Sequence, residues 1–280
     1  METVAIVGVG LIGGSFALAL RQAGFSGRIV GVSSPATLAE ATRLGVVEKG
    51  ITLEEAVRTA DLLYLAQPIL QILNTIDQIA ELNPGPKCLV TDAGSTKEAI
   101  VARGREKLRP GQFLGGHPMA GKELRGVASA EGDLFRDRTY VLTPARAEDL
   151  DIENIREFVS WVEKIGAVPV RMEAAEHDVT VAFTSHLPQL ISTALACTLG
   201  NVLSGEQHIT VSGPGLSDST RLALSDYEIW RDILATNDKN ITEALDLYID
   251  KLSQIRQNLT DPSMYDQFRM GADTVRRFRR

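Results

Sequence analysis

Two short stretches in the first half of the sequence carry residue types suited to acid–base chemistry. His117 lies between a glycine pair and a proline in G-G-H-P-M-A-G at 115–121, and Ser95 lies in D-A-G-S-T-K at 92–97. The glycines let a ligand approach the backbone closely, and the proline fixes the direction of the chain. An imidazole held in this way can act as a base near neutral pH, whereas the structural alternative is a loop histidine that caps backbone groups.

Ser95 has a structural explanation as well as a chemical one. Residues 95–98 have the S-x-x-E form of a capping box ahead of a helical run to Leu108. Capping does not exclude catalysis, because a helix N-terminus aimed into a cleft favours anionic ligands. We expect strands at 87–91 and 112–114 to stop just before the two stretches, since ligands bind at the carboxyl edge of a parallel sheet.

A glycine motif near the start of the chain predicts a dinucleotide site. The motif G-x-G-x-x-G follows an apolar strand at 3–7 and precedes a helical run at 15–23 and a second strand at 28–32. The first glycine permits a tight turn, the second lets the pyrophosphate approach, and the third allows the helix to pack closely. The residues that we expect to contact the dinucleotide here are Gly8, Gly10, Leu11, Ile12 and Gly13.

The end of the second strand bears on the identity of the cofactor. An acidic residue there would bind the ribose of NAD and repel the extra phosphate of NADP. This chain has Ser33 and Ser34 instead, so the repulsion is absent and hydroxyl groups can donate to a phosphate, although no arginine follows at once. The sequence favours NADP, with NAD as the alternative.

Alternating strand and helix patterns continue to residue 171 and predict an α/β, doubly wound, Rossmann-type domain. From Glu173 onward helical periodicities dominate and predict an all-α domain, so we place the domains at 1–172 and 173–280. A helix at 174–199 contains Pro188, which predicts a kink. The other expected elements are helices at 35–44, 53–60 and 149–165, a helix opened by Pro68, and strands at 62–66, 140–142 and 168–171.

Three polar residues of the helical part are candidates for binding a ligand. His186 and Gln189 are three positions apart and share a helix face, although such residues more often satisfy a helix interface. Arg221 follows a loop rich in glycine and serine and suits bidentate binding of a carboxylate. The alternative is an ion pair of Arg221 with Asp218 or Asp226.

Composition excludes several classes of function. The formal net charge of -7 argues against general binding of nucleic acid, and no apolar run is long enough to span a membrane. Cys88 and Cys197 are far apart and have no metal-ligand neighbours, so we expect no metal site and a cytoplasmic protein. Apolar residues from Trp230 to Ile255 recur at helical spacing and predict a core or a dimer seam, which favours a homodimer.

The motifs together resemble the prephenate and arogenate dehydrogenase family over nearly the whole chain. The resemblance rests on Gly8 to Gly13, D-A-G-S-T-K, G-G-H-P-M-A-G, S-H-L-P at Ser185, and D-S-T-R-L-A at Asp218 with W-R-D-I at Trp230. It implies oxidative decarboxylation of prephenate to 4-hydroxyphenylpyruvate with hydride transfer to NAD(P), in tyrosine biosynthesis. It also implies a helical C-terminal domain that forms the dimer and an active site between the domains.

The resemblance also assigns roles to single residues. His117 would accept the proton of the ring hydroxyl, Ser95 would contact that hydroxyl and the nicotinamide side, Arg221 would bind a substrate carboxylate, and His186 would face the cleft. Gln189 stands where some relatives have a second histidine, and its neutral side chain favours prephenate over arogenate, which would be preferred by an acidic pocket. Ser219 and Tyr227 also depart from the residues that are frequent in the family.

Two other classes share parts of this pattern. A two-domain dehydrogenase of β-hydroxyacids would have the same fold but needs a catalytic lysine on the first helix of the second domain, and residues 174–199 contain no lysine. A non-catalytic dinucleotide sensor would keep the glycine motif without needing Ser95, His117 and Arg221 together.

Overall fold

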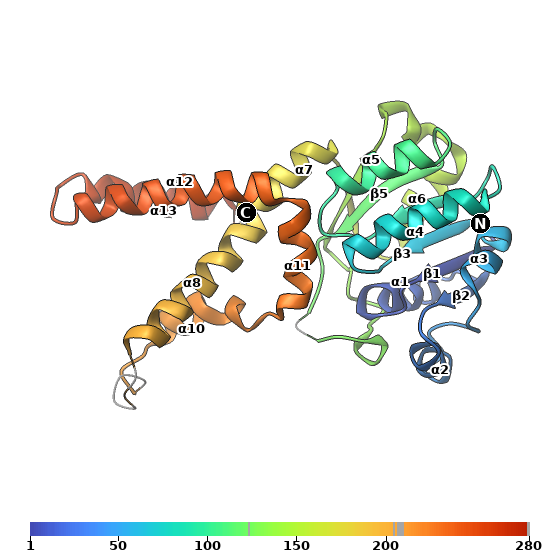
Figure 1. Cartoon of the computed structure of the whole chain (residues 1–280), viewed down its shortest axis with the longest axis horizontal. Helices are drawn as coiled ribbons and strands as arrows, with labels where there is room; N and C mark the ends of the chain where they lie inside the picture. The colour runs from blue at the N-terminus through green and yellow to red at the C-terminus, as the bar shows by residue number, and fades with distance from the viewer. Residues whose placement is uncertain (123, 204, 206–209, 279–280) are drawn as a thin grey trace.

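The computed structural model describes residues 1–122, 124–203, 205 and 210–278. The chain forms a seven-stranded sheet flanked by helices, followed by a part made only of helices (Figure 1). The α/β nucleotide-binding fold followed by a helical part, predicted from the sequence, is confirmed. The strands are β1 (Thr3–Val7), β2 (Arg28–Val32), β3 (Leu62–Leu65), β4 (Leu89–Asp92), β5 (Phe113–Pro118), β6 (Thr139–Pro144) and β7 (Val168–Arg171).

Helices cover both faces of the sheet, because β1 and its neighbours bury side chains on alternate sides. Val4 and Ile6 pack with α1, α2 and α6, whereas Ala5 and Val7 pack with α3, α4 and α5. Both sets are buried, so the strands have near-continuous apolar sequences. The helices are α1 (Leu11–Gln22), α2 (Pro35–Arg43), α3 (Leu53–Thr59), α4 (Ile69–Leu82), α5 (Glu98–Lys107) and α6 (Glu153–Lys164), with short 3-10 turns η1 (Val127–Ser129) and η2 (Ala147–Asp151).

The strand order is β2-β1-β3-β4-β5-β6-β7, and the first five of these strands are parallel. β6 pairs antiparallel with β5, and β7 pairs parallel with β6. The last two strands therefore run opposite to the nucleotide-binding core. This reversal extends the sheet beyond β5.

The strand before His117 is longer than the sequence predicted. We expected it to stop at Leu114, but β5 continues through both glycines to Pro118 and pairs with β6 along this length. A Cβ atom on Gly115 would lie 2.1 Å from Thr143 Oγ1, and one on Gly116 would lie 2.6 Å from the carbonyl oxygen of Asp92. The glycines are there because neighbouring atoms approach closely, which glycine alone allows inside a strand.

The capping box predicted at Ser95 does not form. Helix α5 begins at Glu98, its N-cap position is Lys97, and no side chain within the motif caps it. Instead the carboxylate of Asp178 accepts hydrogen bonds from the backbone N–H groups of Lys97, at 2.7 Å, and Glu98, at 2.9 Å. The cap comes from the helical part of the chain, so Ser95 is not needed for it.

The helical part begins with a run that changes its winding before Pro188. A π-helical turn, η3 (Ala182–His186), separates α7 (Ala174–Val181) from α8 (Leu187–Val202), and Pro188 lies in the first turn of α8. Proline cannot donate to the preceding turn, and the wider π turn accommodates this missing bond. The remaining elements are α10 (Pro214–Thr220), η4 (Arg221–Leu224), α11 (Tyr227–Thr236), α12 (Asp238–Gln257) and α13 (Met264–Phe278).

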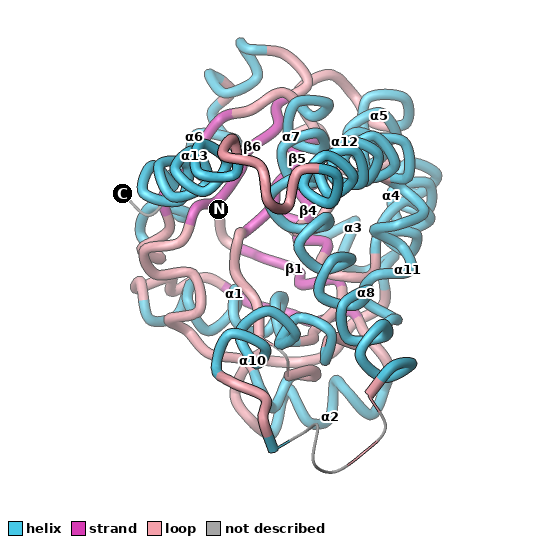
Figure 2. The backbone as a smooth tube through the Cα atoms, turned by 90° about the vertical axis from the view of Figure 1, so that its left-hand side faces the viewer, coloured by secondary structure: helices cyan, strands magenta, loops and turns pink. Residues whose placement is uncertain are grey.

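Two helical arms extend away from the sheet in Figure 1, one of α8 with α10 and the other of α12 with α13. Figure 2 is turned by 90° and shows these helices in front of the strands. Many large apolar side chains on or beside the arms are exposed, and contiguous exposed apolar residues are typical of interaction surfaces. They include Val202, Val211, Leu224, Tyr227, Leu247, Ile249, Leu252, Leu259, Tyr265, Phe268, Met270, Val275 and Phe278. Within the described residues no helix is both long and apolar enough to cross a membrane.

Candidate active site

A cavity of about 800 Å³ lies between the sheet and the helical part. This volume is in the range of small-molecule and cofactor sites. Its walls come from the glycine turn after β1, the chain after β4, the end of β5, the π turn η3 and helix α11. The lining includes Leu11, Ile12, Ser95, His117, His186 and Trp230.

The glycine turn has the geometry that a dinucleotide requires. Gly8 has a φ of +96°, which only glycine adopts readily, and a Cβ atom on Gly13 would lie 2.2 Å from the carbonyl oxygen of Gly8. A Cβ atom on Gly10 would meet nothing within 4 Å, and Gly10 is the N-cap of α1 without a side-chain cap. The N-terminus of α1 therefore offers backbone N–H groups to an open space, which suits a pyrophosphate.

Ser34 has a structural role at the end of β2. Its hydroxyl oxygen accepts a hydrogen bond from the backbone N–H of Thr37 at 3.3 Å and so caps α2. The exposed Ser34 hydroxyl also lies 2.9 Å from Thr37 Oγ1, where either hydroxyl can be the donor, and Ser33 beside it is half-buried. The end of β2 thus carries neutral donors at a helix N-terminus, which tolerates either form of the dinucleotide.

His117 is held in place by a buried ion pair between Asp92 and Lys97. Lys97 Nζ donates to the carbonyl oxygen of Gly116 at 2.7 Å, and Asp92 Oδ1 accepts from the Gly116 N–H at 3.2 Å. Both polar groups of the residue before His117 are therefore bonded to the D-A-G-S-T-K stretch. This is why the two stretches singled out in the sequence lie on one wall of the cavity.

The ring of His117 is also bonded to the helical part. His117 Nδ1 lies 2.8 Å from His177 Nε2, and His177 Nδ1 lies 2.7 Å from Asp178 Oδ1. His177 and Asp178 are buried at 1% and 0% exposure, while His117 is half-buried at the cavity wall. Burial lowers the pKa of His117 well below its usual value, and His177, Lys97 and His186 lower it further. His117 is therefore a neutral imidazole at neutral pH.

His186 is a second neutral imidazole of the cavity. Burial lowers its pKa to about 4, although Asp178 opposes this change. The Asn237 amide nitrogen lies 2.8 Å from the Asp178 carbonyl oxygen and 3.2 Å from His186 Nδ1. The carbonyl can only accept, so the amide nitrogen faces both groups as a donor and the hydrogen of neutral His186 sits on Nε2. His186 can donate a hydrogen bond but carries no charge at neutral pH.

Two predicted ligand-binding residues do not line this cavity in the single chain. Gln189 is buried, and its amide nitrogen donates to the carbonyl oxygen of Leu222 at 2.8 Å. It thereby holds η4 against α8. Arg221, the first residue of η4, is exposed and lies outside the cavity wall. The structure thus brings Ser95, His117 and His186 to the glycine turn, but not Gln189 or Arg221.

The cationic side chains that do line the cavity are all paired. Arg125 Nη1 lies 3.0 Å from Asp226 Oδ2, and Arg231 contacts Glu228 at 2.7 Å and Asp232 at 3.1 Å. Lys122 forms an ion pair with Glu131. All four residues of the W-R-D-I segment line the cavity, including Trp230 and Ile233, which the sequence placed in a core or a dimer seam.

Sequence reasoning missed the residues that position His117. Lys97 was considered only as part of D-A-G-S-T-K, and nothing in the sequence marked His177 or Asp178 as partners of His117. The adjacency of His177 and Asp178 is the one local sign, because a carboxylate often orients a functional histidine. Which imidazole they would orient depends on how the two parts of the chain pack together.

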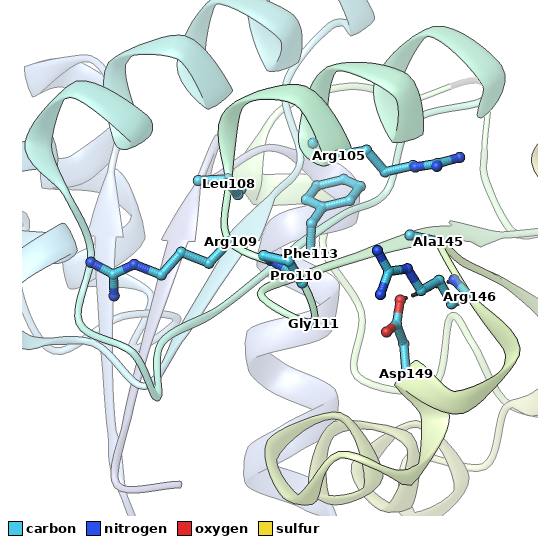
Figure 3. Close-up of a pocket in the computed structure, with 10 residues that line it drawn as sticks. Arg105, Leu108, Arg109, Pro110, Gly111, Phe113, Ala145, Arg146 and Asp149 are labelled. Atoms are coloured by element: carbon cyan, nitrogen blue, oxygen red, sulfur yellow. Dashed lines mark hydrogen bonds between the residues drawn. The ribbon is translucent and has the colours of Figure 1, made fainter.

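A second hollow, of about 130 Å³, lies at the opposite end of β5, where α5 ends (Figure 3). Three arginines line it, but Figure 3 shows the side chains of Arg105 and Arg109 pointing apart, with Arg146 beside Asp149. Arg109 instead donates to Asn83 Oδ1 at 2.6 Å. The guanidinium groups do not converge, so the larger cavity is the candidate active site.

The fold and the larger cavity define the class of protein: a dinucleotide-binding protein with a helical second part and a neutral imidazole facing the glycine turn. Residues 16–170 match the family model described as the nucleotide-binding domain of prephenate dehydrogenase, and residues 173–271 match its dimerization domain. The chain belongs to the prephenate dehydrogenase family. The family resemblance drawn from the motifs is therefore confirmed.

Individual relatives agree with this assignment. The chain is 31% identical over 274 residues to the prephenate dehydrogenase of Bacillus subtilis (strain 168), covering 96% of this chain and 73% of the relative. The crystal structure of prephenate dehydrogenase from A. aeolicus in complex with hydroxyphenyl propionate and NAD+ matches with a TM-score of 0.89 at 29% identity, over 100% of this chain and 98% of that one. Synechocystis arogenate dehydrogenase matches with a TM-score of 0.83 at 28% identity, over 99% of each chain.

Proposed function

We propose that this chain is an NAD(P)-dependent prephenate dehydrogenase, which converts prephenate to 4-hydroxyphenylpyruvate and carbon dioxide. The observation that carries the proposal is that Ser95 and the neutral His117 share one cavity with Leu11 and Ile12 of the glycine turn. A base and a dinucleotide site within one cavity are what the reaction requires, because a proton leaves the substrate hydroxyl and a hydride leaves the carbon that bears it. Membership of the family supports the same reaction.

The chemistry asks little more of the protein than a base and correct positioning. The O–H proton of the ring hydroxyl passes to His117, with Ser95 contacting the same oxygen. The hydride leaves the ring carbon that bears this hydroxyl, and the bond to the ring carboxylate breaks with its electron pair entering the ring. The oxygen then regains a proton and the ring is aromatic. A bound NAD(P) supplies the hydride acceptor in its nicotinamide ring.

Arg221 and the dimer form one part of this proposal. We propose that the exposed apolar arms are covered by a second copy of the chain, as the description of the dimerization domain suggests. Arg221 lies on one arm beside the exposed Leu224 and Tyr227, so its proposed contact with a substrate carboxylate belongs to the assembled dimer. We also propose that the first domain ends at residue 172 and that the second, which contains both arms, begins at residue 173.

The substrate is proposed to be prephenate, with arogenate as the alternative. The two differ by a keto group against an ammonium group, and an unpaired acidic side chain would favour the ammonium. Glu228 and Asp232 line the cavity, but both are paired with Arg231. Gln189 is bonded to Leu222 and does not line the cavity, so the choice of prephenate rests on the pairing of these acidic side chains and not on Gln189.

The cofactor preference is proposed to lean toward NADP. Ser33 and Ser34 at the end of β2 replace the acidic residue that would repel the additional phosphate. The N-terminus of α2 follows directly and favours an anion. Replacing Ser33 with Asp should shift the ratio of kcat/KM toward NAD, and an unchanged ratio would contradict this assignment.

The proposed function is tested by assaying the purified protein with each substrate and each cofactor. Turnover is measured as the change in cofactor absorbance and as the release of carbon dioxide. We expect turnover with prephenate, at a higher kcat/KM than with arogenate. A strong preference for arogenate would mean that arogenate, not prephenate, is the substrate. No turnover with either compound would overturn the proposed function. The oligomeric state, measured by light scattering, should be a dimer, and Leu252→Glu together with Phe268→Glu should weaken it.

A further inference from the structure

We propose that His177 and Asp178 are positioning residues that keep the hydrogen of neutral His117 on Nδ1 and leave Nε2 as the atom that accepts the substrate proton. The inference deepens the proposed function, on which its catalytic meaning rests. It follows from a chain of two short hydrogen bonds that joins His117 to a buried carboxylate through a second imidazole.

The two hydrogen bonds run in one direction because they end at the carboxylate of Asp178. The carboxylate accepts hydrogen bonds from the backbone N–H groups of Lys97 and Glu98, which can only donate. Oδ1, which receives the bond from Lys97, also lies 2.7 Å from His177 Nδ1. An ionised carboxylate has no hydrogen to give, so His177 Nδ1 must carry the hydrogen and donate it.

The direction then passes to His117. A neutral imidazole with its hydrogen on Nδ1 has a lone pair on Nε2, so His177 Nε2 is an acceptor. His117 Nδ1 is 2.8 Å away and must donate to it. The remaining nitrogen of neutral His117 is therefore Nε2, which carries a lone pair. Without this chain either nitrogen of His117 could carry the hydrogen, and one of the two arrangements would block the base.

The same two hydrogen bonds reduce the cost of the positive charge that His117 gains when it accepts the proton. The groups around the ring include the cationic Lys97 and the neutral His186, and Asp92 is taken up by its pair with Lys97. An imidazolium in this buried setting would be costly if its Nδ1–H had no acceptor. His177 supplies the acceptor, and the negative charge of Asp178 lies at its far side. The Nδ1–H of the protonated ring therefore keeps its acceptor, although burial and His177 lower the pKa of His117 overall.

The tautomer can be observed directly, without any substrate. The chain has four histidines, so nitrogen-15 spectra of histidine-labelled protein are simple, and the signals of His117 can be assigned as those lost in His117→Asn. Near neutral pH we expect His117 Nδ1 to give a protonated-type shift and Nε2 an unprotonated-type shift. The opposite pattern would overturn the proposal.

Substitutions at His177 test the positioning role, because they leave Asp178 as the cap of α5. His177→Leu removes the acceptor, and kcat should fall by about tenfold to a hundredfold while KM for substrate and cofactor stays within about threefold. In His177→Gln the amide nitrogen faces the Asp178 carboxylate, so the amide oxygen faces His117 and accepts its hydrogen. This variant should recover most of kcat and keep the tautomer of His117.

The matched control is Asp149→Asn, at a buried aspartate that caps η2 away from the cavity and should leave kcat unchanged. Wild-type kcat in His177→Leu, or equal losses in the Leu and Gln variants, would overturn the positioning role. If His177→Leu does not fold, the positioning role is tested by the nitrogen-15 spectrum of the wild type and by the kcat of His177→Gln. A correct tautomer without turnover would remove the proposed function alone, and turnover with the opposite tautomer would remove this inference alone.

Discussion

The carboxylate of Asp178, in the first helix of the helical part, caps α5 of the nucleotide-binding part through the backbone N–H groups of Lys97 and Glu98. Lys97 and Asp178 have no exposed surface at the junction of the two parts, whereas Glu98 is exposed. One side chain therefore joins the two halves of the molecule, caps the start of α5 and contacts His177, which is bonded to His117.

Replacing Asp178 with Ala should destabilise the fold by about 2–4 kcal/mol, because a cap and a buried charge-assisted bond are lost together. The free energy of unfolding in urea measures the effect. Asp149→Ala is the comparison, since it removes a buried cap that lies within one part of the chain, and we expect about 1 kcal/mol there. If the two variants were equally stable, the contact at Asp178 would contribute nothing beyond an ordinary cap.

Replacing His117 with Asn should lower kcat by about two orders of magnitude or more, because the amide cannot accept the hydroxyl proton. The Kd for NADP or NAD, measured by fluorescence, should stay unchanged, since His117 is not part of the glycine turn. Ser95→Ala removes a single hydrogen bond to the substrate hydroxyl and should lower kcat by about tenfold. Near-normal turnover of His117→Asn would remove it as the base.

The pH dependence of the reaction should reflect the lowered pKa of His117. The neutral form is the active base, and burial with the neighbouring His177 and Lys97 disfavours the protonated form. The base therefore stays neutral as the pH falls through 6.5, and kcat/KM should decline only at pH values well below this ordinary histidine value. A profile of kcat/KM for prephenate with its acid limb at or above 6.5 would contradict the environment described for His117.

Features set by neighbouring residues in the chain could be predicted from the sequence. The glycine turn follows an apolar strand and precedes a helix, so Gly8, Gly10 and Gly13 could each be given a role that the structure supports. The change from strands to helices after Arg171 was equally visible, because it is a change in periodicity. Ser95 and His117 could be selected because their motifs combine reactive side chains with small residues.

Features set by contacts between distant segments could not be predicted. Gly115 and Gly116 were interpreted as the end of a strand, but they stay within it because β6 and Asp92 pass close by. The cap of α5 comes from Asp178, about eighty positions later, so the local S-x-x-E pattern at Ser95 was misleading. The hydrogen bond of Gln189 to Leu222 likewise depends on how η4 packs against α8.

The glycine turn offers a matched pair of substitutions that separates binding from folding. Gly10→Ala places a methyl group where nothing lies within 4 Å, and the φ of -96° at Gly10 suits alanine, so the fold should be kept. The Kd for the dinucleotide should rise by about tenfold or more, because the methyl occupies the space that a pyrophosphate needs. Gly13→Ala places its methyl 2.2 Å from the Gly8 carbonyl oxygen, so it should lower the stability of the protein itself.

Thermal unfolding without cofactor and titration with NADP distinguish the two effects. Gly10→Ala should melt with the wild type and bind weakly, whereas Gly13→Ala should melt at a clearly lower temperature. If Gly10→Ala bound the dinucleotide as tightly as the wild type, the open space at Gly10 would not be the pyrophosphate site. The N-terminus of α1 would then have to bind the cofactor from another side, and Leu11 and Ile12 would no longer connect the cofactor to the cavity of His117.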